Sequence, residues 1–209
     1  MRRGLLFTVS GPSGVGKGTI CKALMDRMPD LKLSISCTTR APRTIESQGR
    51  EYFFISEQEF DQMVENGGFL EHAGVYGKRY GTPRAYVESM LKEGHDVLLE
   101  IEMQGSMQVI AKMPETVGVF VLPPSFEELK RRLIARSTEK EEQIALRLKN
   151  GTQEMQMAYK YRYVLLNDNL EHAVDQLAAI ICAERLRVPN NTQLIDEISK
   201  TFEGGICHD

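Results

Sequence analysis

Short apolar runs alternate with segments of helical periodicity along most of the 209-residue chain. Residues 5–10, 97–101, 117–122 and 163–166 are runs of strand length that are mostly apolar. Residues 17–28 repeat apolar side chains every three or four positions, which is the spacing of a helix with one buried face. This alternation predicts an α/β fold with a largely parallel sheet, because parallel strands are joined by crossover helices.

The alternation changes between residues 33 and 93, where the apolar runs are shorter and more polar and the loops are longer. Ser56 and Glu59 form a capping-box pattern that predicts a helix ending near residue 66. Thr82 before Pro83 predicts the start of another helix that ends near Glu93. We interpret this segment as an inserted lobe. Its other predicted elements are strands at 33–36, 52–55 and 69–75 and a polar loop at 38–50.

The second half of the chain predicts further helices, beginning after Gly105, at Ser125 and at Thr138, and over residues 170–187. The tail after Pro189 is polar with a weak apolar pattern, which is typical of one short helix. The predicted units are the core (1–32, 94–124 and 159–188), the inserted lobe (33–93), a helical lid (125–158) and the tail (189–209).

Composition narrows the function classes only slightly. The net charge of −3 argues against bulk nucleic-acid binding, which usually requires a basic excess. The apolar run at 5–10 is too short for a signal peptide, and no stretch reaches the ~18 apolar residues of a membrane span. The four cysteines are far apart, which favours free thiols in a reducing cytoplasm.

A glycine-rich segment follows the first predicted strand and leads into the first predicted helix. Glycines let successive backbone N–H groups turn inward and bind phosphate oxygens at the positive end of that helix. Lys17 adds a mobile positive charge for the β- and γ-phosphates of a nucleotide. The residues of this phosphate loop are Gly11, Pro12, Ser13, Gly14, Val15, Gly16, Lys17, Gly18 and Thr19.

The phosphate loop departs from the usual pattern at Gly18, where a serine or threonine hydroxyl normally contacts Mg²⁺. No direct metal ligand is therefore predicted. We expect Mg²⁺ to be held mainly by ATP oxygens and water, an arrangement that this ion favours.

The inserted lobe carries motifs that resemble the guanylate kinases. These are Ser36-Cys37-Thr38-Thr39-Arg40-Ala41-Pro42-Arg43, Gly49-Arg50-Glu51-Tyr52-Phe53-Phe54, Phe69-Leu70-Glu71-His72-Ala73, Tyr80-Gly81-Thr82 and Glu100-Ile101-Glu102-Met103-Gln104-Gly105. The resemblance extends from about Leu5 to Arg187. It implies a P-loop NTPase-like three-layer core with a small α+β lobe that binds GMP and a mobile helical lid.

The resemblance also implies roles for single residues. Arg40, Arg43, Tyr52 and Tyr80 would hold the GMP phosphate, and Ser36, Glu71 and Thr82 would bind the guanine. The chemistry agrees, because one carboxylate can accept both the N1–H and N2–H₂ donors of guanine, and adenine lacks that pair.

Three further groups complete the predicted site. Glu100 and Glu102 stand where relatives commonly have aspartates, and they would contact GMP or order water on Mg²⁺. Asn167 lies where relatives contact the adenine of ATP. The lid would supply Arg132, Arg136 and Arg147, whereas Arg131 is better interpreted as a solvated surface residue.

Together these residues predict direct in-line transfer of a phosphoryl group from ATP to GMP, and to dGMP, with Mg²⁺. The nucleophile is a phosphate oxygen that is largely ionised at neutral pH, so no general base is needed. Lys17, Arg40, Arg132, Arg136 and Arg147 are the predicted catalytic residues.

Three alternatives stay open at this point. A different nucleoside monophosphate kinase would share the phosphate loop, and a guanylate-kinase-like scaffold domain would bind peptides without catalysis. An ATPase or GTPase switch would leave the inserted lobe unexplained. The sequence predicts no membrane or nucleic-acid partner, and it leaves the oligomeric state and the packing of the tail, against the core or a second subunit, undecided.

Overall fold

The structure is a computed structural model that describes residues 2–75, 77–136, 148, 151 and 154–206. Its main sheet is parallel throughout, with the strand order β2-β7-β1-β8-β9, which confirms the predicted α/β fold. The strands are β1 (Leu6–Ser10), β2 (Lys32–Leu33), β7 (Val97–Glu100), β8 (Val117–Leu122) and β9 (Tyr163–Leu166).

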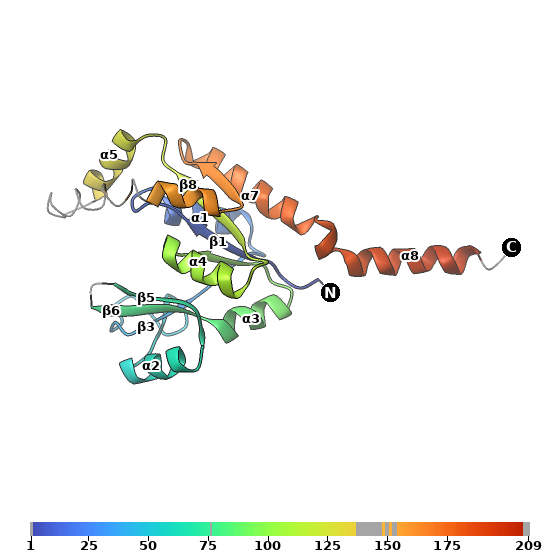
Figure 1. Ribbon diagram of the computed structural model, residues 1–209, viewed down its shortest axis with the longest axis horizontal. Helices are drawn as coiled ribbons and strands as arrows, with labels where there is room; N and C mark the ends of the chain where they lie inside the picture. The colour runs from blue at the N-terminus through green and yellow to red at the C-terminus, as the bar shows by residue number, and fades with distance from the viewer. Residues whose placement is uncertain (1, 76, 137–147, 149–150, 152–153, 207–209) are drawn as a thin grey trace.

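Helices pack on both faces of this sheet (Figure 1). Alternate residues of β1 point to opposite faces, so Phe7 and Val9 join the core beneath α1 (Lys17–Arg27) and α7 (Leu170–Arg185). Leu6 joins the second core, beneath the helices α3 (Arg84–Lys92) and α4 (Met103–Lys112). Burial on both faces explains why the central strands are apolar almost throughout.

A second, mixed sheet forms the separate lobe that lies below α4 in Figure 1. Its strand order is β4-β3-β6-β5, and its small core contains Cys37, Phe60 and Phe69. Its elements are β3 (Ser36–Thr38), β4 (Tyr52–Phe54), α2 (Glu57–Glu65), β5 (Phe69–Val75) and β6 (Lys78–Pro83). The predicted capping box at the start of α2 is confirmed, because Ser56 and Glu59 bond reciprocally.

The remaining elements lie at the two ends of the molecule. The helix α5 (Phe126–Arg136) begins after Ser125, whose hydroxyl accepts a hydrogen bond from the N–H of Glu128, as predicted. The chain ends in α8 (Thr192–Ile206), which projects away from the body (Figure 1). Two short 3₁₀ helices are η1 (Gln156–Lys160) and η2 (Val188–Asn190).

Several predicted bounds are wrong. The single strand predicted at 33–36 is two strands in different sheets, β2 and β3. The strand β6 was not predicted, because Lys78–Pro83 is polar and contains Gly81 and Pro83, yet it pairs with both β3 and β5. The helix expected after Gly105 begins at Met103, and the tail forms a helix of 15 residues rather than a short one. The helix predicted at Thr138 lies outside the described residues.

Among the described residues, no helix is long and apolar enough to cross a membrane. Cys21, Cys37 and Cys182 are free thiols.

Candidate functional site

The phosphate loop connects β1 to α1 at the carboxyl end of the parallel sheet, where ligands of such folds bind. Gly16 caps α1 in the left-handed region with φ of 102°, and a β-carbon there would lie 2.5 Å from Nδ2 of Asn167. Only glycine satisfies both constraints, so the loop keeps the geometry that presents its N–H groups.

Lys17 is folded back across this loop. Its Nζ donates a hydrogen bond of 2.8 Å to the carbonyl of Gly11 and lies 3.6 Å from Oε1 of Glu102. The side chain is only 9% exposed, so its charge is poorly screened by water. Lys17, the cation predicted to bind phosphate, therefore lies against the phosphate loop and beside Glu102.

Glu100 accounts for the unusual Gly18. A β-carbon at Gly18 would lie 3.1 Å from Oε1 and 3.4 Å from Oε2 of Glu100. A serine or threonine would therefore press against this carboxylate, which takes up the space beside the loop where the missing hydroxyl would stand. Burial is the main cause that raises the pKa of Tyr52 on the lobe, and the negative charge of Glu100 has a smaller effect in the same direction.

A cavity of about 320 Å³ opens beside the phosphate loop, where Asn167 is expected to contact adenine. Asn167 is buried at the end of β9 and donates a 2.7 Å hydrogen bond to the carbonyl of Val15. Arg132 donates to the carbonyls of Val15 and Asn167, at 3.2 and 3.0 Å, and is oriented by Glu128. The cavity is lined by Gly14, Gly16, Thr19, Arg131, Arg132, Ala135, Asn167, Asp168 and Leu170.

The predicted lid arginines are described only in part. Arg131 is exposed and pairs with Glu128, which agrees with a surface position, although it also lines the 320 Å³ cavity. Two guanidinium groups hold the pKa of Glu128 at about 2, through hydrogen bonds from Arg131 and Arg132. Arg136 ends α5, and nothing is described of its side chain; Arg147 lies outside the described residues.

On the lobe, Glu71 is a buried carboxylate that accepts hydrogen bonds from the hydroxyl and the backbone N–H of Thr82. It stands opposite Thr82 in the β5–β6 register, and its Oε1 accepts a 2.7 Å hydrogen bond from the Thr82 hydroxyl. A β-carbon at Gly105 would lie 2.8 Å from its Oε2, so glycine there keeps room for the carboxylate. Burial is the main influence on the Glu71 pKa and raises it, against the opposing effects of Thr82 and Lys112.

Two tyrosines of the lobe, Tyr52 and Tyr80, contact Arg40. The Arg40 guanidinium carbon lies 5.4 Å from the ring centroid of Tyr52, and the Tyr52 and Tyr80 rings are 5.9 Å apart. Arg40 forms a hydrogen bond with Tyr80. Ser36 is the register partner of Tyr52 on the neighbouring strand. The structure thus brings together Arg40, Tyr52 and Tyr80, three of the four residues expected to bind the phosphate of a nucleotide.

The sequence analysis missed Glu46, which lies inside this cluster. Its two oxygens accept hydrogen bonds from the two terminal nitrogens of Arg40, at 2.8 and 3.0 Å. It also accepts from the backbone N–H of Arg43, whose side chain is exposed. The bond from Arg40 is the largest cause that lowers the Glu46 pKa to about 2. The sequence signal that could have identified Glu46 is its position as the single acidic residue of the basic loop 38–50.

A second missed residue is Glu154, which accepts a hydrogen bond from the N–H of Ser13 in the phosphate loop. Burial and then the charge of Glu102 raise its pKa. A carboxylate therefore contacts the same backbone donors that a phosphate oxygen would use. No sequence signal separated it from the other acids of the predicted lid.

The described residues contain no group of three or more histidine, cysteine, aspartate or glutamate side chains arranged to hold a metal ion. Glu100 and Glu102 lie close to the phosphate loop. Their carboxylate oxygens can accept hydrogen bonds from water molecules that are bound to Mg²⁺.

Comparisons with known proteins agree on one family. The family model described as guanylate kinase matches residues 3–184. The chain is 52% identical to the guanylate kinase of Caldanaerobacter subterraneus subsp. tengcongensis, over 92% of this chain and 94% of that protein. It is 46% identical to that of Clostridium tetani, over 100% and 98%. The crystal structure of guanylate kinase from Anaplasma phagocytophilum matches with a TM-score of 0.71 and 32% identity, over 90% of each chain.

Proposed function

Because the chain belongs to the guanylate kinase family, it is a nucleoside monophosphate kinase that phosphorylates GMP, and we propose that ATP is the phosphoryl donor. We also propose that dGMP is accepted, that Mg²⁺ is required and that transfer is direct and in line. The observation that carries the choice of acceptor is the buried Glu71 carboxylate, whose hydrogen bonds come from Thr82 and leave further lone pairs for a ligand.

ATP would bind with its phosphates in the loop from Gly11 to Thr19 and its adenine in the cavity beside Asn167. Lys17 would release the carbonyl of Gly11 and bind the β- and γ-phosphates. Glu154 would have to leave Ser13 at the same time, because phosphate oxygens use the same backbone donor.

GMP would bind to the lobe through its base and its phosphate separately. Glu71 would accept hydrogen bonds from N1–H and N2–H₂, and Thr82 and Ser36 would complete the recognition of the guanine edge. Adenine offers no such donor pair, so AMP would leave the Glu71 carboxylate buried and unpaired. The absent 2′-hydroxyl of dGMP plays no part in these contacts.

The GMP phosphate would bind to Arg40, Arg43, Tyr52 and Tyr80. Glu46 serves as a positioning residue, because it holds the Arg40 fork beside the Tyr52 ring before the nucleotide arrives. A guanidinium that is already oriented loses less conformational freedom on binding.

Mg²⁺ would be coordinated by ATP oxygens and water, with Glu100 and Glu102 accepting hydrogen bonds from that water. When bound, the ion supplies positive charge to the phosphates that approach one another.

Catalysis would rest on positioning and charge neutralisation by Lys17, Arg40, Arg132, Arg136 and Arg147. These cations come from the core, the lobe and the lid, so those parts must approach one another when both nucleotides bind. We propose a cytoplasmic enzyme that uses no nucleic-acid or membrane partner.

The direct test measures ADP release with Mg·ATP and each of GMP, dGMP, AMP, CMP and UMP. We expect rapid turnover with GMP and slower turnover with dGMP. The Lys17→Ala variant should lose at least about 10²-fold in kcat, because it removes charge aimed at the transferring group. Turnover that requires a different acceptor, or a Lys17→Ala variant as active as the wild type, would refute the proposal.

A further inference from the structure

The strand β5, which carries Glu71, lies beside the core helix α4 (Figure 1). In the described sheet of the lobe, β5 ends the strand order and pairs with β6 on its inner side. The backbone groups on its outer side must therefore find partners other than a strand. Whatever holds this outer side also fixes where the Glu71 carboxylate lies.

Two side chains of α4 bond to the outer side of β5. Oε1 of Gln108 accepts a 3.3 Å hydrogen bond from the N–H of His72, and Nε2 of Gln108 donates to the carbonyl of His72 at 3.4 Å. The Gln108 amide thus contacts both backbone groups of one residue, as a neighbouring antiparallel strand would. Nζ of Lys112 donates a 2.9 Å hydrogen bond to the carbonyl of Phe69.

These contacts lie on either side of Glu71 along the strand. Gly105 shares a helical face with Gln108 and Lys112, because residues three and seven positions apart point in similar directions. A β-carbon at Gly105 would lie 2.8 Å from Oε2 of Glu71. The helix therefore approaches β5 at the carboxylate itself and bonds to the backbone before and after it.

Apolar packing attaches the same part of β5 to the main core. Leu70 is fully buried in the cluster that contains Val109 of α4 and Leu99 of β7, whereas Phe69 packs in the core of the lobe. The register of β5 against β6 shifts between Phe69 and Glu71, where the strand passes between the two cores. Glu71 thus lies at the junction of lobe and core.

Lys112 also acts on Glu71 through its charge. Burial is the largest cause that raises the Glu71 pKa, and Thr82 and then Lys112 oppose that rise. Thr82 is neutral, so Lys112 supplies the positive charge. Hydrogen bonds from N–H donors are stronger to an ionised carboxylate than to a neutral acceptor. A lysine in the last turn of a helix commonly interacts with the carbonyls of its own helix, but Lys112 contacts the strand instead.

We propose that Gln108 and Lys112 are positioning residues for guanine recognition, which hold the backbone on either side of Glu71 so that its carboxylate faces the base. This inference rests on the proposed role of Glu71. Neither residue would contact the nucleotide. Both belong to α4, which follows Glu102 at the carboxyl end of the main sheet, so they tie the guanine site to the core.

The first test compares Lys112→Met with the wild type by steady-state kinetics and by calorimetry of GMP and IMP binding. The variant loses the bond to Phe69 and the charge, so the KM and the dissociation constant for GMP should rise about tenfold and the preference for GMP over IMP should fall. The kcat and the KM for ATP should stay within about twofold. Lys112→Arg keeps the charge and the donor and should restore wild-type binding.

The matched control is Lys92→Met, which removes an exposed lysine from the last turn of the neighbouring helix α3 and should change none of these quantities. Unchanged GMP binding in Lys112→Met would overturn the inference. Equal losses for ATP and GMP with an unchanged GMP preference would also overturn it, because a purely structural role predicts that result.

A second test combines Lys112→Met and Gln108→Ala with Glu71→Gln. If both residues act through Glu71, each should weaken GMP binding in the wild type and add little in the Glu71→Gln background. Additive losses would overturn the inference and leave the role of Glu71 intact. A Glu71→Gln variant that binds GMP as tightly as the wild type would overturn the proposed role of Glu71 and this inference with it.

Discussion

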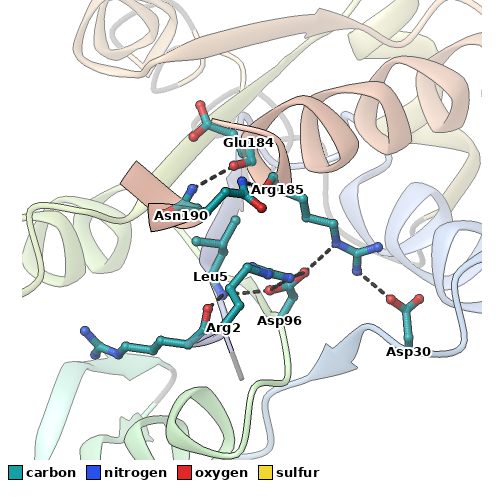
Figure 2. A network of polar contacts seen from close by, with 9 residues as sticks. Arg2, Leu5, Asp30, Asp96, Glu184, Arg185 and Asn190 are labelled. Carbon is teal, nitrogen blue, oxygen red and sulfur yellow. Dashed lines mark hydrogen bonds and ion pairs between the residues drawn. The ribbon is translucent and has the colours of Figure 1, made fainter. Parts of the chain in front are cut away.

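Two buried carboxylates, Asp96 and Glu71, have opposite environments. The Asp96 side chain is 1% exposed and accepts hydrogen bonds from Arg2, Arg185 and the N–H of Leu5, at 3.0, 2.6 and 2.7 Å (Figure 2). Burial raises its pKa, but these three donors outweigh that effect and leave the pKa below its usual range. Glu71 has Thr82 as its hydrogen-bonded side-chain partner, and its pKa is raised.

We interpret Asp96 as a structural carboxylate and Glu71, as proposed above, as one that binds a ligand. Asp96 joins the N-terminal segment, β7 and α7 through contacts that are already complete. Glu71 keeps acceptor capacity, although its burial penalises the charged form. A bound guanine would supply the missing donors, so the cost of burying Glu71 is offset only in the complex.

The largest expected effect is the loss of stability when Asp96 is replaced. Asp96→Ala should lower the free energy of unfolding by about 3 kcal/mol, because it leaves two arginines and a backbone N–H without their buried partner. Urea denaturation measures this change, with kcat/KM retained in the folded fraction. The control Asp30→Ala removes the exposed second partner of Arg185 and should cost under about 1 kcal/mol. Equal losses in both variants would remove the distinction.

The opposite pattern is expected for Glu71. Glu71→Gln should reduce kcat/KM for GMP by about 10²-fold, since a neutral amide accepts the guanine donors weakly and presents donors of its own. Its melting temperature should stay equal or rise, because no buried charge remains. Glu65→Gln at the exposed end of α2 is the matched control and should change neither quantity. A destabilised Glu71→Gln variant with normal kinetics would reverse the assignment.

A smaller effect is expected at Glu46, which accepts hydrogen bonds from Arg40, the residue proposed to bind the GMP phosphate. Glu46→Gln should raise the KM for GMP about tenfold with little change in kcat, because Arg40 loses a charged partner and must be ordered by the nucleotide. The KM for ATP should not change. A lower KM for GMP would instead show that Glu46 competes with the phosphate.

The smallest expected effects are changes in stability with pH, and these have opposite signs for Asp96 and Glu71. The lowered pKa of Asp96 means that its stabilisation is present above the ordinary aspartate pKa near 3.9 and is lost as the pH falls below it. The raised pKa of Glu71 means that its burial costs stability as the pH rises above the ordinary glutamate pKa near 4.3. Unfolding curves of Asp96→Asn and Glu71→Gln against the wild type, from pH 3 to 8, should diverge in these opposite directions.

Sequence reasoning succeeded where the determinants are local. The phosphate loop is contiguous, and strand, glycines and helix follow one another within a few residues. The capping box of Ser56 and Glu59 is also local, spanning a single helical turn. The family motifs of the lobe predicted the cluster of Arg40, Tyr52 and Tyr80 before its geometry was known.

It failed where an element depends on distant partners. Lys78–Pro83 has no apolar alternation, and it becomes β6 only because β3 and β5 pair with it on both sides. Glu46 gains its position from the fold of its loop and Glu154 from its contact with the distant Ser13, and no periodicity encodes either contact. The tail was expected to form one short helix because its apolar pattern is weak, yet α8 extends over 15 residues.

The central claim is that Glu71 selects guanine by accepting from both of its edge donors. Calorimetry of GMP and IMP binding to the wild type and to Glu71→Gln tests it most directly, since IMP lacks only the 2-amino group. We predict that the wild type prefers GMP by about 10-fold or more and that the variant loses most of this preference, as expected for hydrogen bonds to a charged group. An unchanged preference in Glu71→Gln would contradict the claim and place guanine recognition elsewhere in the lobe.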